Sequence, residues 1–525
     1  MKLHLPDYDV FSINANTLAP GSVVQYASVG TVLFNLVVNP DSGKVYVTNT
    51  ELPNHIQFEG PGIHGGSTVQ GHLSESRITV INPATGTIDP QHLNQHIDYS
   101  QLHTDAGADH AAIDAQADHS LATPLQPVVS SDGTTLYVAA YGSGRVGVFN
   151  TEDIEAADFE SEFDPTTQSI NYIHTGGGPS GIALDEVNNQ LYVLTRFDNQ
   201  VEVVDLSSGT VVATHALHNP EPQSIVEGRE FLYDANISSA NGEASCSSCH
   251  IFGDVDQLAW DLGNPDDHVT TNTQPRAVPL SRGTQFHPMK GPMTTQTLRG
   301  MATHGALHWR DDRVDGFFGL DSCAEAAGAP CSEGHSFNNF IVAYEGLVGK
   351  HGTISSSEMQ KFTDFILQVM LPPNPVRALD NSLTADAELG RQRFFGNTSD
   401  GIANCEGCHT LDEANGFFGS GGEQSFEGGT QHFKVPHMRN MYHKIGMFGT
   451  ASGSGTHTGD QVRGFGFLHN GAVDTMFSFF SANLFALNDE QQRQMEAFSL
   501  QFPTDLAPIV GQQVTLSGPA DAAAI

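Results

Sequence analysis

The sequence has few positive charges. Among its 525 residues, 22 are Lys or Arg and 60 are Asp or Glu, so the formal net charge is -38. A surface of this sign repels phosphate backbones and anionic lipid headgroups, which makes nucleic acid and anionic membranes poor partners. The charge favours either a basic protein partner or the gathering of cations, or else solubility in a salty or extracellular setting.

Long apolar runs and a leader segment are also lacking. No stretch approaches the roughly 18 to 20 consecutive apolar residues of a membrane helix, so we expect no membrane span in this chain. The first residues, MKLHLPDYDVFSINANT, have neither the basic start nor the apolar centre of a signal peptide. The length predicts several domains, because one domain usually takes about 100 to 200 residues.

Cysteine is scarce, with six residues, and four of these form two copies of one motif. CSSCH occupies 246–250 and CEGCH occupies 405–409. Two thiols on one turn can add to the two vinyl groups of a haem while the adjoining imidazole reaches the iron. A bare CxxC also suits a redox dithiol or half of a zinc site, but two copies that both end in His favour two covalent haems c. The predicted attachment residues are Cys246, Cys249, Cys405 and Cys408, and the predicted proximal iron ligands are His250 and His409.

Covalent haem implies export. Haem c is attached on the oxidising side of the bacterial membrane, so we expect a periplasmic, extracellular or cell-surface protein, and a sequence without a leader is then expected to be a mature chain or a fragment. The two other cysteines, Cys323 and Cys331, lie in a Gly/Ala/Pro-rich loop. In an oxidising compartment we expect them to form a disulfide.

Residues 1–220 are dominated by short β-branched runs separated by Asp/Asn/Gly turns, a pattern typical of strands. Hairpins of this kind repeat, and hairpins that cannot bury both faces alone predict radial stacking in a β-propeller. The repeats are Phe34–Glu51, Pro127–Glu152 and Gly181–Gly209, with Asp7–Asn14 resembling the closing strands of a further blade. VYVTN at 45–49 resembles the signature of the YVTN β-propeller family. Propellers usually have four to eight blades, so the ring is expected to be incomplete, to have blades hidden in insertions, or to be completed from elsewhere.

An insertion near 89–123 is rich in His and Asp. His92 and His96 have the i, i+4 spacing of a helical metal site. A solvated loop explains the same composition more simply, and we favour that interpretation. The histidines of this insertion are His92, His96, His103, His110 and His119.

From about residue 221 the pattern changes to helices and Gly-rich loops. Each CxxCH motif follows a helical stretch, with Gly228 and Gly390 in matching positions, and each is followed by a long loop and a closing helix. Ser355, Thr384 and Asn488 are predicted helix N-caps. We therefore expect a first cytochrome c-type domain at 221–375, a second at 376–510 and a tail at 511–525.

This paired organisation resembles the bacterial di-haem cytochrome c peroxidase superfamily, which includes the di-haem enzyme of methylamine dehydrogenase maturation. The resemblance covers roughly 220–505 and is carried by GREFLYDANISSANGEASCSSCH, ELGRQRFFGNTSDGIANCEGCH, FKVPHMRN and FLHNGAVDTM. It implies one low-potential haem, where peroxide reacts, and one high-potential haem that stores or relays an electron.

The resemblance also implies axial ligands. A family stretch with a distal His ahead of Gly-Pro maps onto His287, with Met289 and Met293 as competitors. The family methionine that precedes the His of FLHNG is replaced here by Leu468, so the role moves or is lost. We favour Met447, in a glycine-flanked loop, and a thioether there would raise the reduction potential. Met441 and His443 are its alternatives.

Further residues are carried over from the family with departures. Trp309 in HWRDDR resembles the tryptophan between the two haems, although the usual pattern is WDGR. Arg299 and Arg439 are expected to bind haem propionates, because a guanidinium pairs two oxygens at once. The family often holds a calcium ion between its haem domains, so Ca²⁺ is a candidate second cofactor, without named ligands here.

The sequence thus predicts a multidomain protein, an all-β propeller followed by two mainly α cytochrome c-type domains. The expected function is an exported di-haem c oxidoreductase that transfers electrons between its haems and a redox partner protein, with hydrogen peroxide as a candidate substrate. The alternative is a non-enzymatic electron-transfer or surface scaffold protein, in which both irons are six-coordinate and the propeller is a docking module. A separate oxidase site in the propeller would need a cofactor motif, and the sequence has none that we identify.

Overall fold

The computed structural model describes most of the chain. The described residues are 8–57, 68–103, 105, 107–156, 169–265, 267–271, 285–289, 291–310, 313, 332–396, 398–400, 403–419, 424–426, 432–446 and 466–513. The predicted disulfide of Cys323 and Cys331 and the predicted ligand Met447 lie outside these residues. Within the described part, no helix is long and apolar enough to span a membrane.

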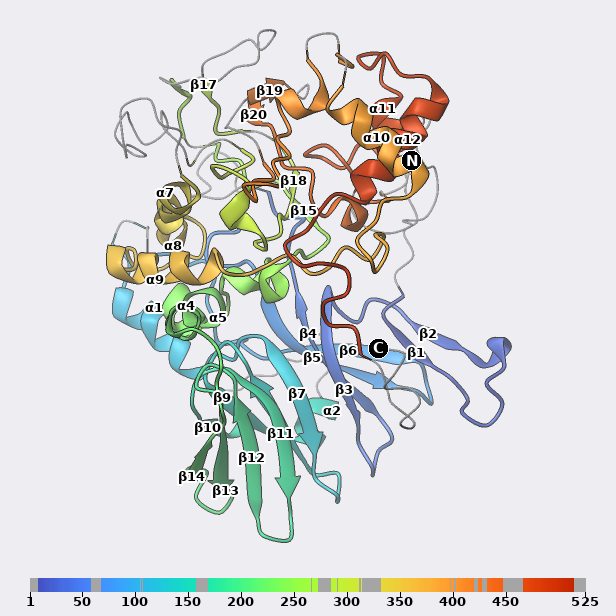
Figure 1. Cartoon of the computed structure of the whole chain (residues 1–525). Coiled ribbons are helices and arrows are strands. Elements are labelled where there is room, and N and C mark those ends of the chain that lie inside the picture. The colour runs from blue at the N-terminus through green and yellow to red at the C-terminus, as the bar shows by residue number, and fades with distance from the viewer. Residues whose placement is uncertain are drawn as a thin grey trace.

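Three separate four-stranded antiparallel sheets form the N-terminal part (Figure 1). Each is a simple meander, and each coincides with one of the repeats predicted from strand periodicity. The first sheet contains β3 (Val32–Val38), β4 (Val45–Glu51), β5 (Glu75–Asn82) and β6 (Thr87–His92). The second contains β7 (Pro124–Val129), β8 (Thr135–Ala140), β9 (Arg145–Asn150) and β10 (Ser169–His174), and the third contains β11 (Pro179–Asp185), β12 (Gln190–Thr195), β13 (Gln200–Asp205) and β14 (Thr210–Ala216).

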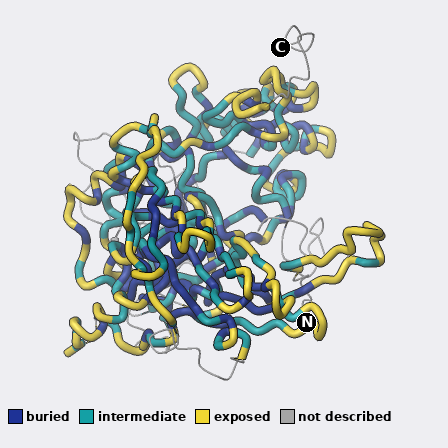
Figure 2. The backbone as a smooth tube through the Cα atoms, turned by 90° about the horizontal axis from the view of Figure 1, so that it is seen from below, coloured by how far each residue is buried: buried dark blue, intermediate teal, exposed yellow. Residues whose placement is uncertain are grey.

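The sheets pack against one another like neighbouring propeller blades. The first strands of the sheets approach one another, since β3 and β11 both contact β7. An apolar core of Tyr46, Val80, Leu136 and Phe149 joins the first sheet to the second, and a further core around Val148 and Val193 joins the second to the third. Figure 2 shows the buried backbone concentrated at the centre of the molecule and the exposed residues in connecting loops.

The predicted fourth blade is only a ribbon in the described residues. β1 (Val10–Ser12), within the stretch that we interpreted as closing strands, pairs with β2 (Val24–Tyr26). This ribbon packs on the first sheet through Tyr26 and Val29. The described part of the chain therefore contains three blade-like sheets and no closed ring.

The insertion is folded rather than a solvated loop. It contributes β6 and the helix α1 (His110–Gln116), which begins at an Asp109 N-cap. Leu93 and Leu121 are fully buried in the core between the first two sheets. Because β6 ends at His92, His92 and His96 do not share a helix face, and the i, i+4 metal site does not form. A further short helix, α2 (Thr151–Ala156), follows β9.

The prediction of two mainly α cytochrome c-type domains is wrong. The molecule is mostly β, and its described helices are short, up to the 12 residues of α12. The helices of the first CxxCH region (221–375) are α4 (Gln223–Gly228), α5 (Glu230–Tyr233), α6 (Ala235–Ser238), α7 (Glu333–Asn338), α8 (Ala343–Gly346) and α9 (Ser356–Ile366). Those of the second CxxCH region (376–510) are α10 (Ala385–Phe394), α11 (Met476–Phe480) and α12 (Asp489–Leu500).

Irregular segments and small ribbons take the place of further helices. The ribbons pair β15 (Ala259–Trp260) with β18 (Met293–Thr294), β16 (Thr270–Thr271) with β17 (Gln285–Phe286), and β19 (Gln424–Phe426) with β20 (His432–Lys434). Local caps and apolar stripes fix where a helix begins, but they do not determine how the Gly-rich chain between two helices folds. The predicted helix starts were correct, but the prediction that these helices form mainly α domains was wrong.

Each CxxCH region has one helix crossing at a glycine. Gly228 of α4 lies against α9, where an added Cβ would be 2.3 Å from the Lys361 carbonyl oxygen. Gly390 of α10 lies against α12, where an added Cβ would be 2.1 Å from the Gln494 carbonyl oxygen. The predicted caps are confirmed, since Ser355, Thr384 and Asn488 each accept a backbone N–H of the first turn.

Candidate cofactor sites at the two CxxCH motifs

A buried carboxylate positions the segment before the first motif. Glu243 Oε1 accepts hydrogen bonds from the Ser76 amide at 2.9 Å and Asn94 Nδ2 at 2.6 Å, and it lies 2.8 Å from His92 Nε2. Glu243 Oε2 accepts from the Tyr99 hydroxyl, whose pKa is raised well above its ordinary value by burial and by the neighbouring carboxylate. The first sheet and the insertion therefore hold the chain three residues before Cys246.

The first cysteine pair begins a short 3-10 turn, Cys246–Ser248, which is capped by a reciprocal hydrogen-bond pair between Ser245 and Ser248. Neither Cys246 nor Cys249 is in a disulfide. Burial raises the pKa of the Cys246 thiol to about 12 and that of Cys249 well above its ordinary value. A redox dithiol needs a lowered thiol pKa, so this environment disfavours that alternative.

The half-zinc alternative lacks further ligands. Among the described residues, neither CxxCH motif belongs to a cluster of three or more His, Cys, Asp or Glu ligand atoms within 4.8 Å of one another. A structural zinc site needs four such ligands. A zinc site is therefore disfavoured within the described residues, and two thiols beside an imidazole are compatible with the covalent attachment of a haem.

A cavity of about 670 Å³ opens beside the first motif. Its volume falls within the roughly 300 to 1,000 Å³ of typical cofactor and ligand pockets. Cys246, Cys249 and His250 lie in its wall. Aromatic side chains supply much of the remaining surface, namely Trp260, Trp309, Phe337, Phe340, Tyr344 and Phe362. The donor set and the apolar wall fit a haem joined to the two thiols.

The two proximal histidines are held in the same way. His250 Nδ1 donates to the Gln296 carbonyl at 2.7 Å, and His409 Nδ1 donates to the Pro436 carbonyl at 2.7 Å. A carbonyl can only accept, so each ring carries its proton on Nδ1, which makes Nε2 the metal-binding nitrogen. Burial lowers the pKa of His250 to about 4, which keeps the imidazole neutral.

The two carbonyls come from matching loops. Gln296 and Pro436 each stand three residues before an arginine, and each arginine is followed by a residue with positive φ, 72° at Gly300 and 67° at Asn440. The two loops, TLRGM at 297–301 and HMRNM at 437–441, therefore match in backbone conformation as well as in the position of the arginine. Pro436 also lines the first cavity, so the support of the second histidine forms part of the wall of the first site.

Several predicted or competing axial residues surround the first cavity. His287 lines it, and its Nδ1 accepts from the Met289 amide at 3.3 Å. Met293 also lines the cavity, whereas the Met289 sulfur packs close to Gly263. His304 and His308, which the sequence did not single out, are further lining imidazoles.

The second motif begins a similar turn, Cys405–Gly407, capped by the Asn404 side chain. Its two cysteines are also outside any disulfide. Of the alternatives to Met447, Met441 packs against the apolar core of the second CxxCH region, and His443 Nδ1 accepts from Asn440 Nδ2 at 3.1 Å.

The two predicted propionate-binding arginines have different surroundings. Arg299 donates to the Phe252 carbonyl at 3.2 Å, lies 3.7 Å from Asp254 and is 27% exposed at its side chain. Arg439 is fully buried, pairs with Asp505 at 2.5 Å and donates to the Gly300 carbonyl. Arg439 thus joins the second loop to the backbone of the first.

Trp309 lies at the junction of the two regions. Its ring is 8% exposed, lines the cavity and packs against Phe433. Lys444 Nζ lies 4.7 Å from the ring centroid, and the Trp309 carbonyl accepts the Lys434 amide at 3.1 Å. Two side chains and one backbone amide of the second region therefore contact a wall residue of the first site.

His304 and His437 form a stacked pair that the sequence did not predict. Their ring centroids are 4.4 Å apart, and both rings line the cavity. Burial, followed by nearby cations or imidazole, holds the pKa of each well below its ordinary value. The sequence offered only the two histidines of MATHGALHW as a sign of this pair. It could not indicate the partner, because His437 lies 133 residues after His304.

Comparison with known proteins gives little. No protein-family model matches the chain, and no curated protein matches it. Among solved structures, hydrazine synthase of Kuenenia stuttgartiensis aligns at 16% identity and a TM-score of 0.28, over 37% of this chain and 50% of that chain. A xenon-pressurised structure of the same enzyme aligns at 17% identity and a TM-score of 0.34, over 54% and 89%. A nidogen/laminin complex aligns at 13% identity and a TM-score of 0.23, over 37% and 52%. The chain spans about half the length of the first of these matched chains, and likenesses this weak carry no functional argument.

Proposed function

We propose that the chain is an exported di-haem c-type oxidoreductase that resembles the di-haem cytochrome c peroxidase superfamily. The observation that carries the proposal is the matched pair of sites. Each has two thiols outside any disulfide, an adjoining imidazole and an Nδ1–H donated to a backbone carbonyl at 2.7 Å. Bound haem would supply a redox-active iron at each site.

The residues of the chain have definable roles in this proposal. Cys246 and Cys249 would anchor one cofactor and Cys405 and Cys408 the other, while the Gln296 and Pro436 carbonyls fix the imidazole tautomers. Trp309 would provide an aromatic path between the sites, since it borders the first cavity and contacts the second region.

The net charge of the chain and the cavity at the first motif suggest a redox partner and a substrate. The net charge of -38 suits a basic redox partner protein, and the long-range field would raise the rate of encounter. Hydrogen peroxide is the proposed substrate, because the family that the chain resembles reacts with peroxide at its low-potential haem. The cavity imidazoles His304 and His308 are candidates for moving protons during cleavage of the O–O bond.

A second function, a non-enzymatic electron carrier, is favoured by one observation. The first cavity is lined by several side chains that can ligate iron, namely His287, Met293, His304 and His308. Any of these in the sixth position would close the iron to peroxide. The blade-like sheets would then serve as the docking module for a redox partner.

Spectroscopy of the half-reduced protein distinguishes the two functions. The chain is produced with haem c attachment, and mass and haem content are measured first; fewer than two covalent haems overturns both proposals. Electron paramagnetic resonance and peroxide turnover are then measured together. A high-spin, five-coordinate haem with turnover supports the peroxidase, whereas low-spin signals in every state without turnover establish the carrier. A variant with Cys405 and Cys408 both changed to Ala assigns each signal to its site.

A further inference from the structure

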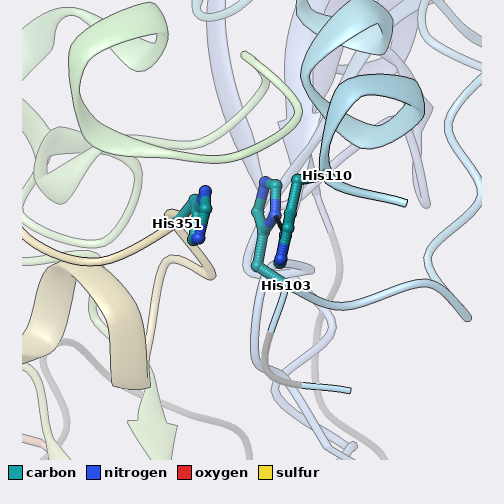
Figure 3. A group of neighbouring side chains, drawn as sticks. All are labelled: His103, His110 and His351. Atoms are coloured by element: carbon teal, nitrogen blue, oxygen red, sulfur yellow. Dashed lines mark hydrogen bonds between the residues drawn. The ribbon is translucent and has the colours of Figure 1, made fainter. Parts of the chain in front are cut away.

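Three histidines meet at the boundary between the N-terminal part and the first CxxCH region (Figure 3). His103 and His110 belong to the insertion, and His351 comes from the segment between α8 and α9. We call this group the trihistidine cluster. It is far along the chain from both CxxCH motifs, and the proposed redox function does not use it.

The cluster has the spacing of a metal site. One ring nitrogen from each histidine can be chosen so that all three lie within 4.8 Å of one another. The ring centroids of His103 and His110 are 4.9 Å apart, those of His103 and His351 are 5.0 Å apart, and those of His110 and His351 are 3.9 Å apart. In a tetrahedral zinc site with Zn–N of about 2.0 to 2.1 Å, ligand nitrogens lie about 3.4 Å apart. The three rings are stacked, with interplanar angles of 20°, 12° and 8°, so binding one ion requires the rings to turn until one nitrogen of each faces a common point.

A carboxylate orients the most buried member. The His103 side chain is 2% exposed, and its Nε2 lies 3.1 Å from the Asp114 carboxylate. With Nε2–H donated to Asp114, His103 Nδ1 accepts a hydrogen bond from His110 Nδ1–H at 2.7 Å, and a metal ion bound between these two nitrogens would replace that proton. A metal-ligating histidine usually donates its other N–H to a carboxylate or carbonyl in this way, which fixes the tautomer and ring orientation.

The donor set selects the class of ion. Three imidazoles, without a thiolate among them, suit borderline divalent metals, whereas calcium and magnesium require oxygen ligands. Asp114 comes from α1, one helical turn after His110, so the helix presents the ligand His110 together with the carboxylate that supports His103. The strongly acidic surface would raise the local concentration of any cation.

We propose that the trihistidine cluster binds one zinc ion, which fastens the insertion to the segment that leads into α9. His103 Nδ1, His110 and His351 are the protein ligands, Asp114 is a positioning residue, and water takes the fourth position. α9 begins at Ser356, and its Met359 and Phe362 line the cofactor cavity. The ion would thus stabilise one wall of that cavity without taking part in its chemistry.

The test is a zinc titration of the full-length, haem-loaded protein after treatment with a chelator. A competing fluorescent zinc chelator gives the stoichiometry and affinity, and thermal melting gives the stabilisation. We expect one tight equivalent and a higher Tm with zinc, and calcium should not displace that equivalent. His351 is exposed, so His351→Gln should fold normally and lose the tight equivalent together with the Tm rise.

Two further variants sharpen the result. Asp114→Asn should weaken zinc binding about 10- to 100-fold, as expected for a supporting carboxylate. His218→Gln is the matched control, because His218 is an exposed histidine outside the cluster. The proposal is overturned if no equivalent binds tightly, or if His351→Gln binds zinc as the parent protein does. Haem content and visible spectra, measured on the same samples, report the redox function separately.

Discussion

The glycine crossing of α10 and α12 makes a quantitative prediction. In Gly390→Ala, the new Cβ would stand 2.1 Å from the Gln494 carbonyl oxygen and 2.8 Å from Phe498 Cβ. Real Cβ contacts essentially never fall below 3.0 Å, so α12 must move away by at least about 0.9 Å. Forced overpacking of this kind costs about 1 to 3 kcal/mol. The higher helix propensity of Ala returns about 0.5 to 1 kcal/mol.

We therefore expect Gly390→Ala to lower the free energy of unfolding, by up to about 2.5 kcal/mol. Gly346→Ala is the matched control, because Gly346 is in α8 with no heavy atom within 4 Å of its added Cβ. That variant should be neutral or slightly stabilised. Urea denaturation followed by far-ultraviolet circular dichroism compares the midpoints of the two variants with the parent. The reasoning fails if Gly390→Ala is as stable as Gly346→Ala.

Three further changes have defined outcomes. Hydrogen bonds from Arg196, and further pairing with Arg229, lower the pKa of Glu221 to about 2. The ionised carboxylate therefore stabilises the fold fully at a pH above its ordinary pKa of about 4.3. This stabilisation is lost as the pH falls towards 2. Glu221→Gln should accordingly be less stable than the parent at pH 6, by a margin that shrinks between pH 4 and pH 2 in denaturation curves; an unchanging margin would contradict this. Trp309→Phe should keep both haems but slow electron transfer between them in flash-reduction experiments, and an unchanged rate would remove Trp309 from the path. Met447→Ala should lower the potential of the second haem or make it high-spin, and an unchanged spectrum would move the ligand to Met441 or His443.

Local features of the fold were predictable from the sequence. The strand hairpins follow from period-two alternation between turn residues, and the three predicted repeats are the three sheets. The cap of α9 follows from the spacing of Ser355 and Glu358, whose reciprocal hydrogen bonds form as expected. The matching positions of Gly228 and Gly390 also indicated equivalent helices, and both glycines lie at close helix crossings.

Long-range features were not predictable, for a physical reason. No motif in the sequence marks Glu243 as a structural residue. It holds the segment before the first motif through hydrogen-bond donors on β5 and in the insertion, which only the folded chain brings close to it. His351 meets His103 across 248 residues of chain, from 103 to 351, so no spacing rule could pair them. The extent of the helical regions was overestimated, because helix signals are local whereas the conformation of glycine-rich chain is set by distant contacts.

The different surroundings of Arg299 and Arg439 determine which substitutions the two loops tolerate. The two arginines occupy matching positions of a repeated loop, but Arg299 is partly exposed and Arg439 is fully buried. The Arg439 guanidinium donates a hydrogen bond to the Gly300 carbonyl of the other loop. The hydrogen bond is made to the main chain, so it does not depend on side chains elsewhere in the first loop, but a side chain at Gly300 would place its Cβ 2.6 Å from Arg439 Nη2, at a backbone φ of 72°. The two CxxCH regions are therefore not interchangeable. Replacing one loop by the other would remove the hydrogen bond between Arg439 and the Gly300 carbonyl, even though the two loop backbones match.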